Sequence, residues 1–142
     1  MKRFSAQYVF TGNGALIKRG TVITDDAGTI ISVEPPDRNT EHHSTGFYNG
    51  IIAPGFVNCH CHLELSYLKG KINKSVGLPE FIFNVRSLRQ SPEEEITSAI
   101  QKADREMFAE GISLCGDICN NNLTFGIKRK SKISYISLPE IF

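Results

Sequence analysis

The chain has 142 residues, of which 40% are hydrophobic and 22% charged, and its formal net charge is +1 at neutral pH. This length allows an ordinary domain core, and the near-neutral charge gives no indication of a nucleic-acid or anionic-membrane partner. No apolar run approaches the ~20 residues of a membrane-spanning helix, and the N-terminus lacks the apolar stretch of a secretory signal. These features predict that the four cysteines are reduced thiols in a cytoplasmic protein.

The first 50 residues carry the signals of short β-strands. Tyr8, Val9 and Phe10 give the first segment high β-propensity. Residues 25–28 read as a turn that joins two strands into a hairpin, and Pro35 ends the second of them because proline has no N–H for a ladder. The predicted strands cover residues 3–10, 15–17, 21–24 and 29–33.

Residues 37–46 are polar and show no periodicity, which predicts a loop. His42 and His43 lie in this loop. As neighbours they would point apart in an extended chain, so we interpret them as solvent-exposed histidines.

Residues 51–62 form the most informative stretch, an apolar run predicted to be a strand that ends in His60 and His62. Alternate side chains of an extended chain point to the same face, so both imidazoles are expected to point the same way. Two neutral imidazoles on a rigid strand can bind one divalent metal ion. Two histidines on a sheet face can also be ordinary hydrogen-bonded residues, and the pair alone leaves both interpretations open.

Two helices are predicted after this strand. In residues 79–88, the side chains of Phe81, Ile82, Val85 and Leu88 fall on one helical stripe.

The second and longer helix has a capping-box pattern, with Ser91 as N-cap, Pro92 at the first helical position and Glu94 three residues after the cap. Gly111 suits the residue that follows its end. Strands are predicted at 112–118 and 132–138, with one helical turn between them. This alternation predicts α/β architecture with a parallel sheet.

The segment APGFVNCHCHLE at residues 53–64 resembles a signature of the amidohydrolase superfamily, in the branch that contains guanine and cytosine deaminases, chlorohydrolases and aminofutalosine-type deaminases. Residues 14–33 are similar to the N-terminal strands of those enzymes. The resemblance implies that residues 1–50 are strands of a small composite β-sandwich. Residues 51–142 would then be the first βα units of an incomplete (β/α)8 TIM barrel.

The resemblance also implies a metal-dependent hydrolase acting on carbon–nitrogen bonds other than peptide bonds. Deamination of an aminated nucleobase or nucleoside-like small molecule fits best, while dechlorination and amide hydrolysis stay open. The implied cofactor is one divalent ion, with zinc favoured over iron, held by His60 and His62. We interpret Glu64 as a substrate contact, as an acceptor that orients a ligand histidine, or as an exposed loop acid. The family's later catalytic His, Asp and Glu motifs are not found in this sequence, so no catalytic residue is assigned.

A (β/α)8 barrel typically takes about 250 residues, so we expect this chain to be the N-terminal part of a longer hydrolase. Alone it is expected to be inactive. It is also expected to form a homo-oligomer or to depend on the missing C-terminal portion.

Two further groups have alternative interpretations. Asp117, near the end of a predicted strand, is either a functional group at the strand tip or a helix cap for the segment that follows. The basic cluster of Lys128, Arg129, Lys130 and Lys132 reads as a solvated loop rather than a binding patch, because a phosphate-binding surface usually needs a broader basic face.

The cysteines allow a rival function, a small structural zinc-binding or interaction module. The C-x-C spacing of the first pair matches zinc knuckles poorly, and strand alternation sends that pair to the face opposite His60 and His62. Thiols packed between a strand and its helices explain them more simply. The four candidate ligands of the rival site are Cys59, Cys61, Cys115 and Cys119.

Overall fold

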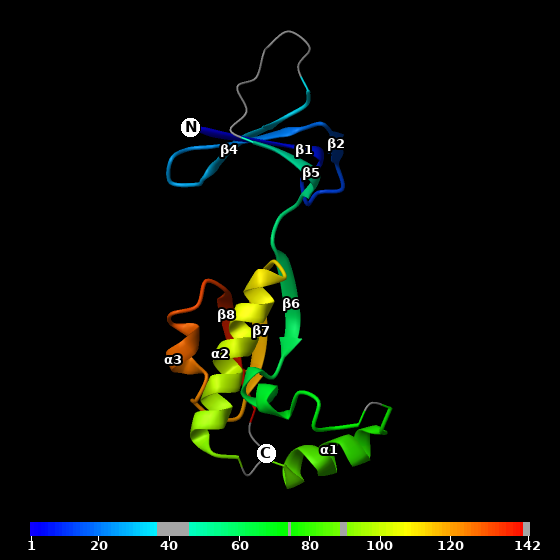
Figure 1. The fold of residues 1–142 in the computed structure, drawn as a ribbon, viewed down its shortest axis with the longest axis vertical. Coiled ribbons are helices and arrows are strands. Elements are labelled where there is room, and N and C mark those ends of the chain that lie inside the picture. The colour runs from blue at the N-terminus through cyan, green and yellow to red at the C-terminus, as the bar shows by residue number, and fades with distance from the viewer. Residues whose placement is uncertain (37–45, 74, 89–90, 141–142) are drawn as a thin grey trace. The chain divides into compact units, whose positions relative to one another are not determined.

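The computed structural model describes residues 1–36, 46–73, 75–88 and 91–140 (Figure 1). The chain divides into two compact units, Met1–Pro54 and Gly55–Phe142. The predicted loop at 37–46, with His42 and His43, lies outside the described residues except for its last position. No helix within the described ranges is long and apolar enough to cross a membrane.

Strand β1 (Lys2–Phe10) is the centre of the first unit, which in its described part is a five-stranded sheet. β1 pairs antiparallel with β2 (Leu16–Lys18) and with β3 (Thr21–Thr24), and β3 continues to β4 (Ile30–Glu34). β5 (Gly46–Ile52) pairs with β1 in parallel. The predicted strands and hairpin are confirmed. Their apolar core is formed by Ala6, Val9, Val22 and Ile23.

The apolar run at residues 51–62 is divided between two sheets, so the prediction of a single strand there is wrong. Its first two residues end β5 in the first unit, and β6 (Phe56–Cys61) begins the second unit. Pro54 lies between the two strands and has no N–H to continue a ladder. The proline therefore separates the strand that carries the histidines from the first sheet.

The residues after β6 form a short 3-10 helix, η1 (Leu63–Leu68). His62 is the residue that precedes this helix. No helical stripe is visible in the sequence here, because a six-residue 3-10 helix is too short to show periodicity.

The second unit, as far as it is described, contains a three-stranded parallel sheet in the order β6-β7-β8. Helices α1 (Leu78–Ser87) and α2 (Glu93–Ala109) lie between β6 and β7 (Ile112–Cys119) in the chain. The short helix α3 (Phe125–Lys128) lies between β7 and β8 (Ser134–Pro139). The predicted alternation and parallel pairing are confirmed.

Helix α2 begins differently from the predicted capping box. Its first residue is Glu93, and Pro92 is the N-cap, with no capping hydrogen bond from a side chain. Ser91 is therefore one residue too early to cap it. The predicted end is confirmed, because Gly111 takes the left-handed φ of +87° that glycine accepts without strain.

The core of the second unit joins the helices to η1 and the sheet. Tyr67 and Leu68 of η1 pack with Val85 of α1, and Ile96 and Ala99 of α2 pack against this cluster. The side chains of Leu63, Ile100 and Cys115 are fully buried.

Replacing Ile100 by alanine should therefore destabilise the second unit by about 2–5 kcal/mol, through lost apolar burial and a residual cavity. Urea unfolding followed by helical circular dichroism measures this change. The matched control is Ile82→Ala on α1, where the side chain is 47% exposed. Equal effects of the two substitutions would contradict this description of the core.

Candidate metal centre

The end of strand β6 places two imidazole rings next to each other. The ring centres of His60 and His62 are 5.1 Å apart, and their planes make an angle of 68°. His60 belongs to the strand, whereas His62 is the first residue after it. Residues two apart in an extended chain share a side, and this local geometry brings the rings together.

Strand β7 approaches β6 very closely beside His60. A Cβ atom at Gly116 of β7 would lie 3.0 Å from the carbonyl oxygen of Cys59. Since such a contact is tighter than most that side chains make, glycine at this position allows the two strands to pack together here.

The imidazole of His62 is not used for capping. His62 occupies the N-cap of η1, yet its side chain makes no capping hydrogen bond. Its Nδ1 atom is buried and has no hydrogen-bond partner among the described residues. A buried polar atom without a partner is uncommon in native proteins and indicates that a water or an ion completes it.

The spacing of the two rings fits a shared zinc ion. Two imidazoles bound to one tetrahedral Zn²⁺ through Zn–N bonds of about 2.0–2.1 Å have ring centres roughly 5 Å apart. An edge-to-face aromatic pair has a similar spacing, so the distance alone does not separate the two arrangements. The buried Nδ1 of His62 favours the metal, because an aromatic contact leaves that atom without a partner.

A catalytic zinc site commonly has three protein ligands and one water. Within the residues that the structure describes, no three His, Cys, Asp or Glu side chains come together as a metal-binding group. His60 and His62 are therefore two candidate ligands of such a site in the described part of the chain.

Glu64 is buried, with only 3% of its surface exposed, so its interpretation as an exposed loop acid is wrong. Its Oε2 atom accepts hydrogen bonds from the backbone N–H groups of Asn120, at 3.0 Å, and Asn121, at 3.2 Å. These bonds connect η1 to the loop after β7. A role for Glu64 in contacting substrate stays a prediction.

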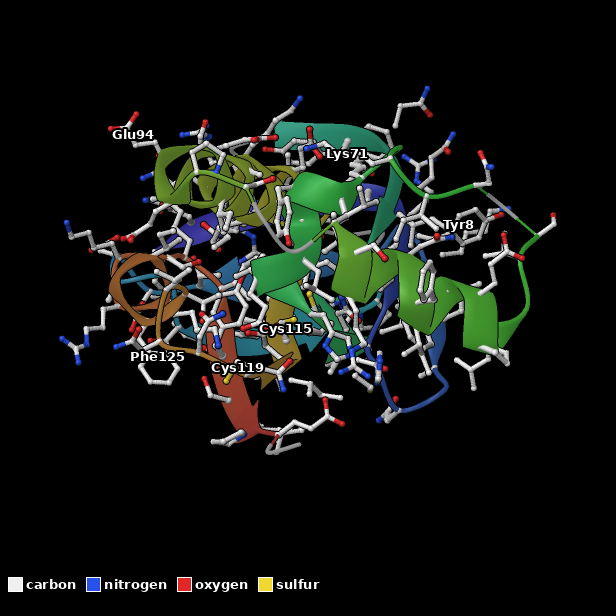
Figure 2. All side chains as sticks on the ribbon, turned by 90° about the horizontal axis from the view of Figure 1, so that it is seen from below. Tyr8, Lys71, Glu94, Cys115, Cys119 and Phe125 are labelled. Atoms are coloured by element: carbon white, nitrogen blue, oxygen red, sulfur yellow. The ribbon has the colours of Figure 1, made fainter. Side chains whose placement is uncertain are left out.

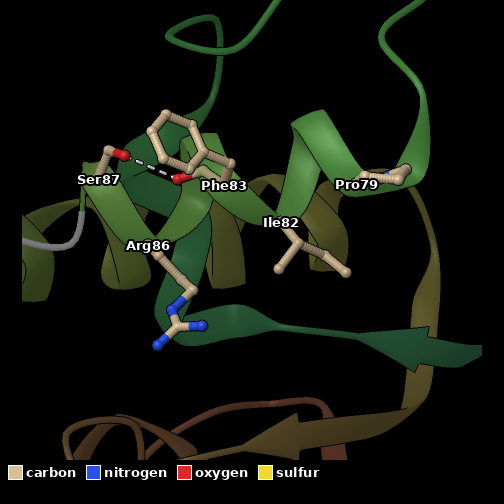
Figure 3. Close-up of a pocket in the computed structure, with 5 residues that line it drawn as sticks. All are labelled: Pro79, Ile82, Phe83, Arg86 and Ser87. Carbon is tan, nitrogen blue, oxygen red and sulfur yellow. Dashed lines mark hydrogen bonds between the residues drawn. The ribbon is translucent and has the colours of Figure 1, made fainter.

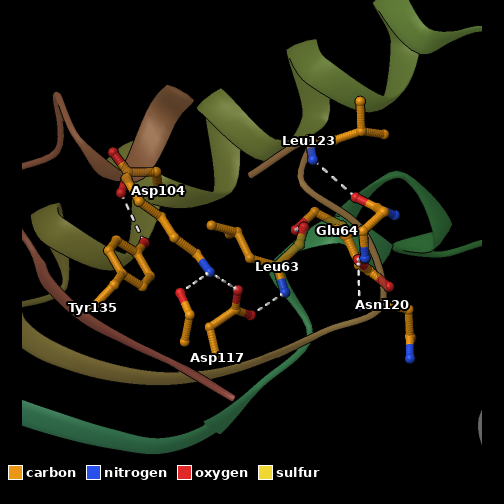
Figure 4. A network of polar contacts seen from close by, with 11 residues as sticks. Leu63, Glu64, Asp104, Asp117, Asn120, Leu123 and Tyr135 are labelled. Atoms are coloured by element: carbon orange, nitrogen blue, oxygen red, sulfur yellow. Dashed lines mark hydrogen bonds and ion pairs between the residues drawn. The ribbon is translucent and has the colours of Figure 1, made fainter. Parts of the chain in front are cut away.

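Asp117 lies near the end of β7, and its carboxylate is fully buried. Its Oδ1 accepts the backbone N–H of Leu63 at 2.7 Å, and its Oδ2 lies 2.5 Å from Nζ of Lys128 (Figure 4). Asp117 therefore binds the first residue of η1, which comes before it in the chain. The interpretation as a cap for the following segment is wrong.

The sequence placed Lys128 in a solvated basic loop, and for this residue the interpretation is wrong. Its side chain is only 7% exposed and forms the buried ion pair with Asp117. No spacing rule relates these two positions. They meet because the connection after β7 brings α3 back against the sheet, which a periodic pattern does not reveal.

The four cysteines do not form a common cluster in the described residues. Cys59 is exposed, whereas Cys115 and Cys119 are buried along β7 (Figure 2). Burial raises the pKa of the Cys61 thiol to about 12, with smaller contributions from Cys115 and Asp117. The contacts of Cys61 with Cys115 and Asp117 fit thiols that are packed inside the unit.

Two hollows in the second unit are poor candidates for a substrate site. An open groove of about 540 Å³ runs along α1, lined by Pro79, Ile82, Phe83, Arg86 and Ser87 (Figure 3). It contains no acid, histidine or thiol. A cavity of about 160 Å³ beside Glu64 is smaller than the ~300–1,000 Å³ of typical ligand sites. Neither hollow is a substrate pocket by itself.

Comparison with solved structures finds enzymes of similar fold. The structure of Helicobacter pylori aminofutalosine deaminase in complex with methylthio-coformycin matches with a TM-score of 0.79 and 20% identity, over 99% of this chain and 35% of that one. Zinc-complexed atrazine chlorohydrolase TrzN from Arthrobacter aurescens TC1 matches with a TM-score of 0.73 and 14% identity, over 98% and 35% of the two chains. Guanine deaminase from C. acetobutylicum, with bound guanine, matches with a TM-score of 0.67 and 17% identity, over 96% of this chain and 35% of that one.

The structural neighbours are deaminases and chlorohydrolases of the amidohydrolase superfamily. The resemblance stated from residues 53–64 is thereby confirmed, and at these identities the likeness establishes the fold. The chain spans about a third of the length of the enzymes it matches. No family model and no curated protein matches the sequence.

The cysteine environments predict an order of alkylation. With iodoacetamide at pH 8, Cys59 should react first because it is exposed, while Cys115 and Cys119 react only on unfolding. Cys61, with its pKa near 12, should be slow because a fraction of only about 10⁻⁴ is thiolate at that pH. Peptide mass spectrometry after timed quenching measures the order, with urea-unfolded protein as control. Modification of Cys115 in the folded protein as fast as that of Cys59 would contradict the described packing.

Proposed function

We propose that this chain supplies His60 and His62 as metal ligands of a metal-dependent hydrolase that acts on carbon–nitrogen bonds other than peptide bonds. The proposed reaction is hydrolytic deamination of an aminated nucleobase or nucleoside-like small molecule. The observation that carries the proposal is the adjacent pair of imidazoles at the end of β6, with ring centres 5.1 Å apart.

The similar structures support this choice of metal and substrate class. One of them is complexed with zinc, which favours zinc as the ion. The two deaminases hold methylthio-coformycin and guanine respectively, and these ligands favour a nucleoside-like or nucleobase substrate. The aminofutalosine deaminase matches with a TM-score of 0.79 and the chlorohydrolase with 0.73, so we place deamination ahead of dechlorination.

For the fold we propose that the second unit is the opening of a (β/α)8 barrel and that the first unit belongs to a small β-sandwich. The parallel order β6-β7-β8 follows the chain order, with helices in both connections, as in the barrel architecture. The boundary we propose is at residues 54 and 55, where the compact units meet along the chain.

In barrels of this kind, functional groups lie at the C-terminal ends of the strands. His60 lies next to the C-terminal end of β6, and His62 follows that end directly. When bound, a divalent ion lowers the pKa of a coordinated water from ~15.7 towards ~7. The role of this chain's own residues is to present two neutral imidazole nitrogens on a rigid strand end.

The 142-residue chain should bind one Zn²⁺ through these histidines. The double substitution His60→Ala, His62→Ala should weaken binding by at least about tenfold, because it removes both imidazole ligands. Competition titration against a chromophoric chelator measures the affinity. We also propose that the chain alone has no measurable deaminase activity, so the Zn²⁺-loaded protein should release no ammonia from guanine or cytosine.

The matched control is Cys59→Ser, Cys61→Ser, which alters the two residues interleaved with the histidines and should retain Zn²⁺. Loss of zinc in the cysteine variant, with retention in the histidine variant, would overturn the proposal in favour of a structural zinc module. Histidine-dependent ammonia release would refute only the proposed inactivity of the chain alone.

A further inference from the structure

We propose that Asp117 and Lys128 are positioning residues that fix the backbone from which the His62 imidazole extends before metal binds. The inference rests on the proposed function, in which His60 and His62 are the ligands. Neither Asp117 nor Lys128 would touch the metal. They would act through the backbone of the residue that follows His62.

The peptide unit between His62 and Leu63 is held at both of its polar ends. The N–H of Leu63 donates to Oδ1 of Asp117 at 2.7 Å. The carbonyl oxygen of His62 accepts the N–H of Leu65 at 2.9 Å. Because a peptide unit is planar, fixing both groups fixes the plane. His62 has φ −122° and ψ 75°, and this ψ orients the plane relative to the His62 side chain.

The carboxylate that holds Leu63 is itself fixed from the opposite side. Oδ2 of Asp117 lies 2.5 Å from Nζ of Lys128, which also donates to Oγ of Ser137 at 2.9 Å. The ammonium group lies over the rings of Phe125, at 5.4 Å, and Tyr135, at 5.5 Å. The network thus connects β7, α3 and β8 to the backbone directly beyond His62 (Figure 4).

The contribution of a buried ion pair to folding stability does not by itself explain why Asp117 and Lys128 are paired here. The desolvation of two charges offsets much of their attraction, and apolar replacements of such pairs are often neutral or stabilising. What an apolar pair cannot supply is an acceptor for the Leu63 N–H. Groups that orient metal ligands typically change metal affinity by about 10- to 100-fold when they are removed.

Asp104 provides an internal comparison. Its Oδ1 accepts hydrogen bonds from the hydroxyls of Ser131, at 2.6 Å, and Tyr135, at 2.8 Å. These bonds join α2 to the residues around β8. Asp104 is thus a structural acid of the same unit that makes no bond to the His62–Leu63 peptide and reaches Lys128 only through the ring of Tyr135.

Two matched double variants separate orientation from charge. Asp117→Asn with Lys128→Met removes both charges and keeps a carbonyl acceptor for Leu63. Asp117→Leu with Lys128→Met removes the same charges and also the acceptor. In Zn²⁺ competition titrations of the full chain, the affinity of the asparagine variant should stay within about threefold of that of the unmodified chain. The affinity of the leucine variant should fall by about 10- to 100-fold. The visible spectrum of the Co²⁺-substituted protein should change only in the leucine variant, and Asp104→Asn should change neither measurement.

Equal Zn²⁺ affinities and equal Co²⁺ spectra of the two double variants would overturn the positioning role while leaving the proposed ligands intact. Zn²⁺ binding that does not depend on His60 and His62 would overturn the proposed function instead.

Amide hydrogen exchange on the unmodified, metal-free chain tests the same idea if the leucine variant fails to fold. The Leu63 amide should be protected, and adding Zn²⁺ should change its protection little, because the peptide is held in advance. Exchange at the rate of an open loop amide would refute the inference.

Discussion

The hydrogen bond from the Leu63 N–H to the buried carboxylate of Asp117 is the contact on which the arrangement of the site depends. It fixes the point where an extended strand becomes a 3-10 turn, and this transition determines where the His62 ring lies relative to His60. The carboxylate is fully buried and is balanced by Lys128. At this position the second unit is held together by a short polar network, whereas elsewhere it is held together by apolar packing. Such a network is directional, which suits the task of aiming a side chain.

The parallel sheet explains why residues distant in sequence meet here. Parallel strands end at a common edge, so the residues that follow β6 and those at the end of β7 are neighbours. Glu64 and Asp117 both use this edge: Asp117 binds the first residue of η1, and Glu64 binds the loop after β7. The two acids therefore link the same two segments reciprocally: Asp117 of β7 accepts a bond from η1, and Glu64 of η1 accepts bonds from the loop after β7. Glu64 and Asp117 are both buried and hydrogen-bonded across this edge, which is the kind of support that the proposed metal ligands His60 and His62 would need.

The sequence predicted those parts of the fold that local rules control. Strands β1 to β4 of the first unit, helices α1 and α2 and the parallel order of the second sheet follow from propensity, periodicity and alternation, whereas β5 was not predicted. The break at Pro54 was missed because the apolar residues on its two sides belong to different sheets, and only tertiary pairing assigns them. The His60 and His62 pair was found because it lies within one local segment. The partnership of Asp117 with Lys128 was missed because it depends on how the connection after β7 returns to the sheet.

X-ray absorption spectroscopy at the zinc edge would show whether His60 and His62 bind the same ion. If they do, the Zn²⁺-loaded chain should show nitrogen or oxygen neighbours at about 2.0–2.1 Å, with the outer-shell scattering of two imidazole rings. A first shell of sulfur at about 2.3 Å, or scattering from no more than one imidazole, would contradict binding of a shared ion.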